Sequence, residues 1–228
     1  MRKELVIAKK EIKGILRSKS SLLFAGYAIF FSFIAALGIK KSPNAIDTAV
    51  FCIPVVMGVF FAYTSTGKIF LREKRDRIIE TLLCAPVSLR KIWFGKVLGA
   101  AVPSYVVSVL SAVLIVLISS FFLKFVIFPS RIFLLHMLIT TPLFIFASVG
   151  LIGLLYLLAG MKEVGAAGII IFIGIFGALF ESLSLTGEGY RISLSAELAL
   201  FVASLVLTVL TGYLTRYLSR ERIVTTIG

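Results

Sequence analysis

The residue types that usually carry chemistry are scarce in this chain of 228 residues, which has one histidine (His136) and two cysteines (Cys52 and Cys84). The two Gly-Lys pairs, at Gly67 and Gly95, lack the upstream glycine and the following hydroxyl of a phosphate-binding loop. No His-Glu-x-x-His or Cys-x-x-Cys pattern occurs. We therefore expect no catalytic centre, metal site or cofactor within this chain, and two free thiols.

The densest charge pattern lies in residues 72–96, which read REKRDRIIETLLCAPVSLRKIWFGK and separate two long apolar runs. A proline ends the first half of this segment, and Ser88 is suited to cap a second helix. The pattern predicts a helix, a tight break and another helix outside the bilayer, a shape that fits a groove on a soluble partner that performs mechanical work. The apolar stripe of the first helix consists of Ile78, Ile79, Leu82 and Leu83.

The composition indicates the elements that position this segment. Hydrophobic residues make up 59% of the chain and charged residues 15%, whereas soluble domains are typically about 25% charged. A bilayer core about 30 Å thick needs roughly 20 apolar residues per helix. The fold class we expect is an all-α membrane protein, one domain over residues 1–228, with an exterior loop at 181–197. Its six transmembrane helices follow apolar runs at 21–39, 50–66, 97–123, 132–159, 164–183 and 196–214.

The basic residues indicate the orientation. Nineteen of the 24 lysines and arginines fall on the side that holds both termini, and five fall on the other. Loops rich in lysine and arginine stay in the cytoplasm, so we expect both termini to be cytoplasmic in the cell membrane. Anionic lipid headgroups attract such cations by about 1 kcal/mol each. The net charge of +13 therefore indicates a lipid bilayer and no nucleic acid as the partner.

The N-terminal arm, residues 1–19, repeats apolar residues at helical spacing between lysines and arginines. Such a helix lies flat in the headgroup layer with its apolar side toward the lipid. We expect an interfacial elbow helix that leads into the first span. Its apolar stripe is Leu5, Ala8, Ile12, Ile15 and Leu16.

The charged segment resembles the intracellular loop of the type-2 permease family of ATP-binding-cassette (ABC) transporters. In that family an acidic helix is followed by a leucine pair, a Pro-Val-Ser turn, and a Gly-Lys pair at the start of the third span. Arg77 and Ile78 depart from the pattern, since the family often has glycine and threonine there. The matching residues here are Glu73, Glu80, Leu82, Leu83, Pro86, Val87, Ser88, Gly95 and Lys96.

The resemblance implies a half-transporter of six spans with an elbow helix and a cytoplasmic coupling helix, within residues 68–96, between spans two and three. It implies pairing with a second copy or a sister permease. It also implies a separate ABC ATPase subunit that binds ATP and Mg²⁺, so that this chain is not itself an enzyme. The residues expected to dock that subunit are Glu73, Arg77, Glu80, Leu83, Pro86, Val87 and Ser88.

In such families the second and fifth spans face the shared pathway. The aromatic and small residues of these two spans would also be explained by ordinary helix packing or by an aromatic belt at the membrane interface. No span carries a charge near its middle, which favours an apolar or amphipathic substrate over intramembrane ion coupling. His136 is expected as a hydrogen-bonded histidine near the outer end of span four. The candidate pathway residues are Phe60, Tyr63, Thr64, Phe172, Phe176 and Glu181.

Two alternatives stay open. A cytochrome-maturation permease of the haem-exporter type has a similar length and six spans. A membrane scaffold would recruit a cytoplasmic partner without transporting anything. An exporter subunit is required for ATP hydrolysis by its partner, whereas a scaffold binds its partner in every nucleotide state.

Overall fold

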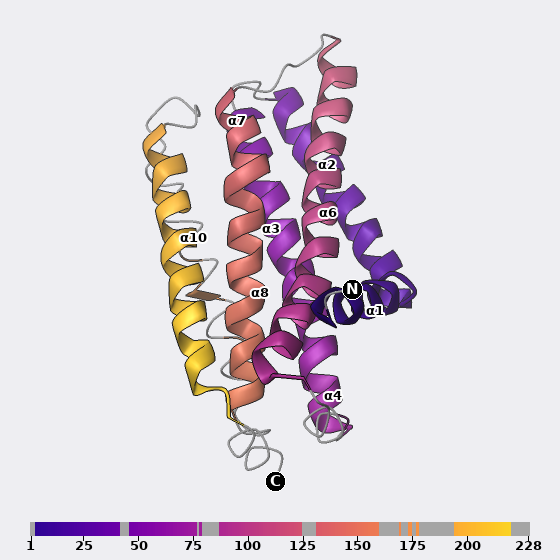
Figure 1. Cartoon of the computed structure of the whole chain (residues 1–228). Coiled ribbons are helices and arrows are strands. Elements are labelled where there is room, and N and C mark those ends of the chain that lie inside the picture. The colour runs from indigo at the N-terminus through magenta and orange to yellow at the C-terminus, as the bar shows by residue number, and fades with distance from the viewer. Residues whose placement is uncertain are drawn as a thin grey trace.

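The computed structural model describes residues 3–41, 46–76, 87–124, 131–159 and 194–219, together with residues 78, 169, 173, 174 and 177. Every regular element in this part of the chain is helical, so the all-α class is confirmed for it (Figure 1). The elements are α1 (Lys3–Leu16), α2 (Lys19–Lys41), α3 (Ile46–Thr66), η2 (Gly67–Leu71), α4 (Arg72–Arg75), α6 (Leu89–Leu123), α7 (Arg131–Leu135), η3 (His136–Thr140), α8 (Thr141–Leu158), α10 (Leu194–Leu214) and η4 (Thr215–Tyr217).

Two long helices each contain one π-helical segment. The elements α3, η2 and α4 follow one another without a break, and so do α7, η3 and α8. The N–H groups of Arg72 and Thr141 donate to the carbonyls of Gly67 and His136, five residues earlier, as in a π-turn. Pro142, two residues after the end of η3, has no N–H to donate, so a wider turn before it relieves the local hydrogen-bond pattern.

Four helices in the described residues are long and apolar enough to cross a membrane: Thr48–Arg75, Leu89–Leu123, Arg131–Leu158 and Glu197–Tyr217. In α2, the apolar part Gly26–Leu37 is shorter. The predicted fifth run, 164–183, lies outside the described residues except at four positions. Most of the predicted exterior loop also lies outside them, and α10 begins at Leu194.

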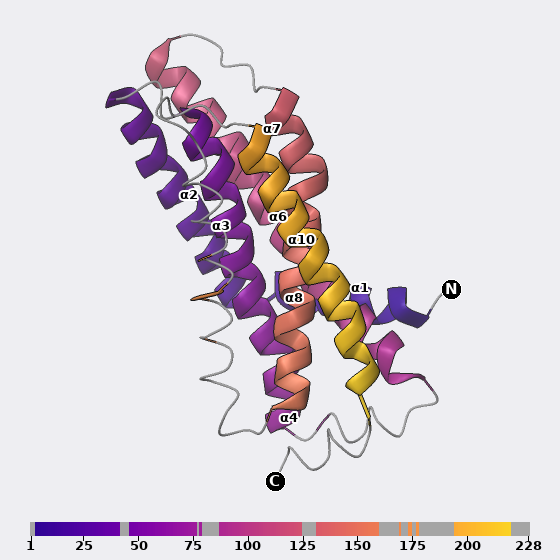
Figure 2. The same cartoon turned by 90° about the vertical axis from the view of Figure 1, so that its left-hand side faces the viewer.

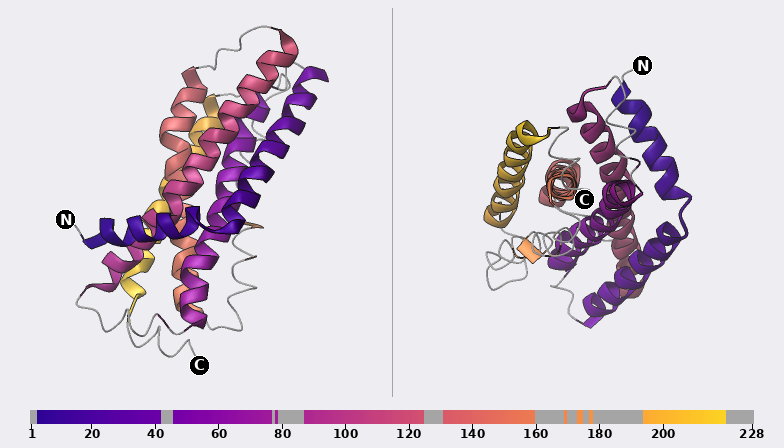
Figure 3. Two further views of the ribbon diagram at one scale, coloured as in Figure 1. Left: turned by 90° about the vertical axis from the view of Figure 1, so that its right-hand side faces the viewer. Right: turned by 90° about the horizontal axis from the view of Figure 1, so that it is seen from below.

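The helices pack in a fixed order around α6, which contacts α1, α2, α3 and α8. Helix α10 packs on α8 at one edge of the bundle (Figure 1) and is the helix nearest the viewer in Figure 2. Helix α1 crosses the bundle on the outer side of α6 (Figure 3). We call the two ends of the bundle the α4 end, where α4 and the start of α6 lie, and the α7 end, where α6 stops and α7 begins (Figure 1).

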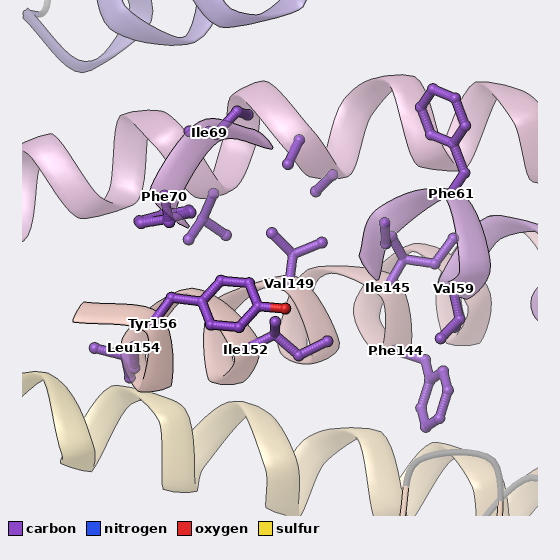
Figure 4. Close-up of a cluster of buried hydrophobic side chains, with 14 of the residues drawn as sticks. Val59, Phe61, Ile69, Phe70, Phe144, Ile145, Val149, Ile152, Leu154 and Tyr156 are labelled. Atoms are coloured by element: carbon purple, nitrogen blue, oxygen red, sulfur yellow. The ribbon is translucent and has the colours of Figure 1, made fainter. Parts of the chain in front are cut away.

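The core contains large apolar side chains (Figure 4), and glycines face some of them. A Cβ at Gly153 would lie 2.9 Å from the Phe70 ring, and one at Gly150 would lie 3.2 Å from the ring of Trp93. Lipid tails are as apolar as these side chains, so in a bilayer close packing of this kind, not burial from water, holds helices together.

Helix α1 is held against α6 at two glycines. A Cβ at Gly95 would lie 2.9 Å from the carbonyl oxygen of Glu4, and one at Gly99 would lie 2.5 Å from the Cβ of Glu11. These two residues form the kind of small-residue face that allows close helix approach. Any larger side chain at either position would push α1 away from α6.

The predicted apolar stripe of the N-terminal helix is divided between two environments. Ala8 and Ile15 are buried against the bundle, whereas Leu5 and Leu16 are exposed. The stripe therefore serves the contact with α6 as well as an outer apolar surface.

Candidate functional site

The first candidate site is the base of the predicted coupling segment, at the α4 end. Glu73 on α4 forms an ion pair with Lys96 on α6, and the two side chains are 14% and 5% exposed. The Lys96 ammonium also lies 5.6 Å from the centroid of the Phe70 ring, within the range of a cation–π contact. Glu73, predicted as a docking residue, is thus engaged inside the chain and ties α4 to the first turns of α6.

The neighbouring residue, Lys74, is fully buried and ties α4 to a different helix. Its Nζ donates to the carbonyl oxygens of Ala159, Tyr156 and Leu157 at 2.5, 3.3 and 3.5 Å. The last four carbonyls of a helix lack partners within the helix and carry its negative dipole end. Lys74 therefore caps α8 with a positive charge where α8 ends.

Two consecutive residues thus fix the base of the coupling segment in opposite directions, Glu73 onto α6 and Lys74 onto α8. After this base, Asp76 forms an exposed pair with Arg72 at 3.5 Å, a type of surface pair worth about 0–1 kcal/mol. The side chain of Ile78 is exposed. The buried contacts of the segment among the described residues are therefore those of Glu73 and Lys74.

The second helix of the coupling segment is α6, which begins where the sequence predicts. Ser88 has extended backbone angles, and its carbonyl accepts hydrogen bonds from the N–H groups of Lys91 and Ile92 at 3.0 and 3.1 Å. The N-cap position is confirmed, but the Ser88 side chain makes no capping hydrogen bond. Val87 is partly exposed. The predicted docking residues Arg77, Glu80, Leu83 and Pro86 lie outside the described residues.

A groove of about 280 Å³ separates α1 from the η2–α4 segment. Both signs of charge line it, including Lys10 and Glu11 from α1 and Lys68 and Arg72 from the other side. Burial raises the pKa of the Glu11 carboxyl, an effect that the nearby Lys96 ammonium opposes. The groove thus presents charged groups of both signs directly beside the Glu73–Lys96 pair.

The candidate pathway residues of α3 have different surroundings. Phe60 is 39% exposed on the outer face of the helix. Tyr63 packs against the core, where its side chain hydrogen-bonds with Tyr156. The hydroxyl of Thr64 donates to the carbonyl of Phe61 at 3.0 Å, within its own helix. Phe172, Phe176 and Glu181 lie outside the described residues.

The second candidate site is a buried polar cluster of three side chains near the α7 end: His136, Thr140 and Glu197. His136 Nδ1 lies 2.7 Å from Glu197 Oε2, and the hydroxyl of Thr140 donates to Glu197 Oε1. All three side chains are almost fully buried. The ring of Phe51 stacks on the imidazole, with centroids 4.0 Å apart. This cluster joins α10 to η3 by hydrogen bonds in apolar surroundings.

The sequence predicted part of this cluster. His136 was expected to be hydrogen-bonded, and its Nδ1 is; its Nε2 has no hydrogen-bond partner within the described part of the chain. Glu197 was assigned to the exterior loop, but it lies in the first turn of α10 and is 1% exposed. Buried ionisable groups within spans are costly and often functional, so Glu197 is a candidate site residue that sequence reasoning missed.

In the described residues the fold is all-helical, with four helices long and apolar enough to cross a membrane and with buried polar contacts that join helices near both ends of the bundle. No family model matches the sequence, and neither a curated protein nor a solved structure matches it.

Proposed function

We propose that this chain is the membrane-spanning permease subunit of an ATP-driven ABC exporter of the type-2 class. The observation that supports this function best is the pair of anchors at Glu73 and Lys74. A force applied to residues 77–86 by a soluble partner reaches α6 through the first anchor and α8 through the second. A segment that only connected two spans would not need either buried cation.

In this proposal, a separate ATPase subunit binds ATP and Mg²⁺ and docks on the coupling segment around Glu80. Nucleotide can shift the bundle between inward-open and outward-open states only if the ATPase contacts differ between those states. The anchors make such differences effective, because they transmit displacement of the segment instead of absorbing it. The permease pairs with a second copy or a sister permease to enclose the pathway.

The proposal includes six spans with both termini in the cytoplasm. Helix α8 ends at the α4 end and α10 begins at the α7 end (Figure 1). Residues 160–193 therefore connect opposite ends of the bundle, as a fifth span does. The α4 end is the cytoplasmic one, because the basic residues of α1, α4 and the first turn of α6 gather there.

The decisive experiment is purification of the tagged chain from its native membrane in mild detergent. We expect an ABC ATPase to copurify and its ATP hydrolysis to depend on this chain. Glu80→Arg should reduce the copurified ATPase about tenfold or more, since a reversed charge in an interface costs several kcal/mol. Glu188→Arg, in the predicted exterior loop, is the matched control and should leave copurification unchanged.

The outcomes separate the proposed function from a scaffold. The exporter function would be refuted if the partner bound equally with and without nucleotide and if its ATP turnover did not depend on this chain. Equal loss of copurification in both variants would indicate damaged folding and would contradict docking at Glu80.

The orientation has its own test. In a variant lacking Cys52 and Cys84, a cysteine introduced by Ser193→Cys should react with a membrane-impermeant maleimide added to intact cells. The native Cys84, tested in a variant lacking Cys52, should react only after the membrane is permeabilised. The opposite pattern would overturn the proposed topology.

A further inference from the structure

A groove of about 300 Å³ opens between α6 and the α7–η3 helix, toward the α7 end. Six residues of α6, between Tyr105 and Leu117, form one wall, and four residues between Phe133 and Leu138 form the other. Nine of these ten side chains are apolar. The tenth, Tyr105, donates its hydroxyl to the carbonyl of Met137 at 3.0 Å, so its one polar atom is already used.

The shape of the groove follows from the packing of its two helices. Toward the α4 end, α6 and α8 pack closely at Gly150, where an added Cβ would lie 3.2 Å from the ring of Trp93 on α6. The Tyr105–Met137 hydrogen bond joins α6 to η3, and beyond it the two helices diverge (Figure 1). The groove is therefore closed at its inner end and open along the outer face of the bundle, where Val113 and Leu138 are 48% and 68% exposed.

The length of the groove matches one leaflet of a bilayer. Tyr105 and Leu117 are twelve residues apart on a continuous helix, which corresponds to about 18 Å at 1.5 Å per residue. Half of the hydrocarbon core of a bilayer is about 15 Å. A single acyl chain has the cross-section and the purely apolar surface that this groove can hold.

Two exposed cations lie beyond the groove at the α7 end. Arg131 precedes the lining residue Phe133 by two positions, and Lys124 ends α6 seven residues after Leu117. At 1.5 Å per helical residue these offsets are about 3 and 10 Å. The α7 end of the groove is thus basic, which is where the phosphate of a lipid seated in the groove would lie.

We infer that this groove binds one acyl chain of an anionic phospholipid, with its phosphate beside Arg131 and Lys124. The acyl chain gains little by leaving the surrounding lipid, because the groove is no more apolar than the bilayer. The cations therefore provide the preference for an anionic lipid, and the groove fixes where that lipid lies. The inference rests on α6 and α7–α8 spanning a bilayer and does not involve an ATPase partner.

The test uses the full-length protein, depleted of lipid in detergent and titrated with phosphatidylglycerol or phosphatidylcholine under native mass spectrometry. We expect phosphatidylglycerol to bind about tenfold to thirtyfold more tightly, since each cation near the headgroup contributes about 1 kcal/mol. The double variant Arg131→Gln/Lys124→Gln should remove most of this preference. Lys13→Gln, at the other end of the molecule, should leave it unchanged.

A second pair of variants tests the groove itself. Val113→Trp fills it at an exposed position, so the fold should tolerate the change while phosphatidylglycerol binding falls about tenfold. Val106→Trp is the matched control, because Val106 is 50% exposed on the same helix but does not line the groove. The proposal would be overturned if the protein bound both lipids equally, or if the two tryptophan variants had equal effects. It would also be overturned if Val113→Trp changed the oligomeric state without losing lipid.

Discussion

The ion pair between Glu73 and Lys96 can be tested by a double-mutant cycle. Removing one member of a buried pair costs about 3–5 kcal/mol, because the other charge is left without a partner. Lys96→Met leaves the Glu73 carboxylate without its partner. Because the Glu73 side chain is 14% exposed to water, we expect a loss in the free energy of unfolding at the lower end of this range, about 3 kcal/mol. At 1.4 kcal/mol per factor of ten, the ratio of folded to unfolded protein falls about a hundredfold.

The two single variants should differ in size. Lys96→Met also brings Glu73 into uncompensated repulsion with Glu11, whose carboxyl interacts electrostatically with both members of the pair. Glu73→Gln leaves the ammonium facing Glu11 and the Phe70 ring, so its effect should be smaller. The double variant should recover most of the loss, because it leaves no unpaired charge at the site.

The chain supplies its own probe for this measurement, since Trp93 is the single tryptophan and is 6% exposed in the core. Its emission should shift to longer wavelength as the bundle unfolds in mixed micelles with increasing denaturing detergent. Unfolding of the Lys96→Met variant at the wild-type midpoint, or strictly additive effects in the double variant, would refute the assignment of a stabilising buried pair.

Three further predictions concern other contacts. Gly99→Val should push α1 away from α6 and destabilise the protein by about 1–3 kcal/mol. Gly14→Ala, where the new Cβ enters open space, should be neutral or stabilising by up to about 1 kcal/mol. Thermal unfolding in detergent compares the two variants. Because the pKa of Glu11 is raised, the folded state holds the proton of this carboxyl more tightly than the unfolded state does. The free energy of unfolding should therefore decrease as the pH rises above 4.5, the ordinary pKa of the group. Unfolding curves taken across pH should show a smaller decrease for Glu11→Gln. Glu197→Leu should leave His136 unpaired and lower the free energy of unfolding by about 1–3 kcal/mol or more, whereas Glu197→Gln should lower it much less. Equal shifts of the unfolding midpoint in the two variants would contradict the hydrogen-bonded cluster.

The sequence predicted the four long apolar helices of the described residues, because long apolar runs have few alternatives. It also predicted the N-cap position at Ser88. The spacing of Gly95 and Gly99 is that of a small-residue face, which allows close helix approach. It did not predict which helix meets that face, because a pair of glycines specifies a close approach and not a partner. The partner is α1, which amphipathicity alone had placed flat in the headgroup layer.

The buried position of Lys74 had a signal in the sequence that its charge obscured. Lys74 follows Phe70 by four residues on a continuous helix and therefore lies on the same face, and Phe70 is buried. The run of charges from residue 72 suggested a solvated segment outside the bundle. A buried lysine also requires acceptors, and the free carbonyls at the end of α8 are 82 to 85 residues away in the sequence.

The cluster around His136 could not be assembled from the sequence for a related reason. Its two ionisable members are 61 residues apart, and periodicity identifies the buried face of a helix but not the residue opposite it. The predicted loop boundary at residue 197 further concealed Glu197, because a glutamate at the edge of an apolar run is normally exposed. The π-helical turn in which His136 and Thr140 lie precedes Pro142, whose missing N–H is a local cause of the wider turn.

The positions of the polar contacts restrict how this bundle can change shape. The continuous α7–η3–α8 helix is bonded to α10 near one end, through His136 and Glu197, and to α4 at the other end, through Lys74. Near the same two ends it is also bonded to α6 through Tyr105 and Met137 and to α3 through Tyr63 and Tyr156. Its middle packs by van der Waals contact at glycines such as Gly150. Buried hydrogen bonds are costly to leave unmade in apolar surroundings, whereas individual van der Waals contacts are weak and can be exchanged for similar ones. Under the proposed function, α8 therefore moves together with α10 and with the continuous α3–η2–α4 helix.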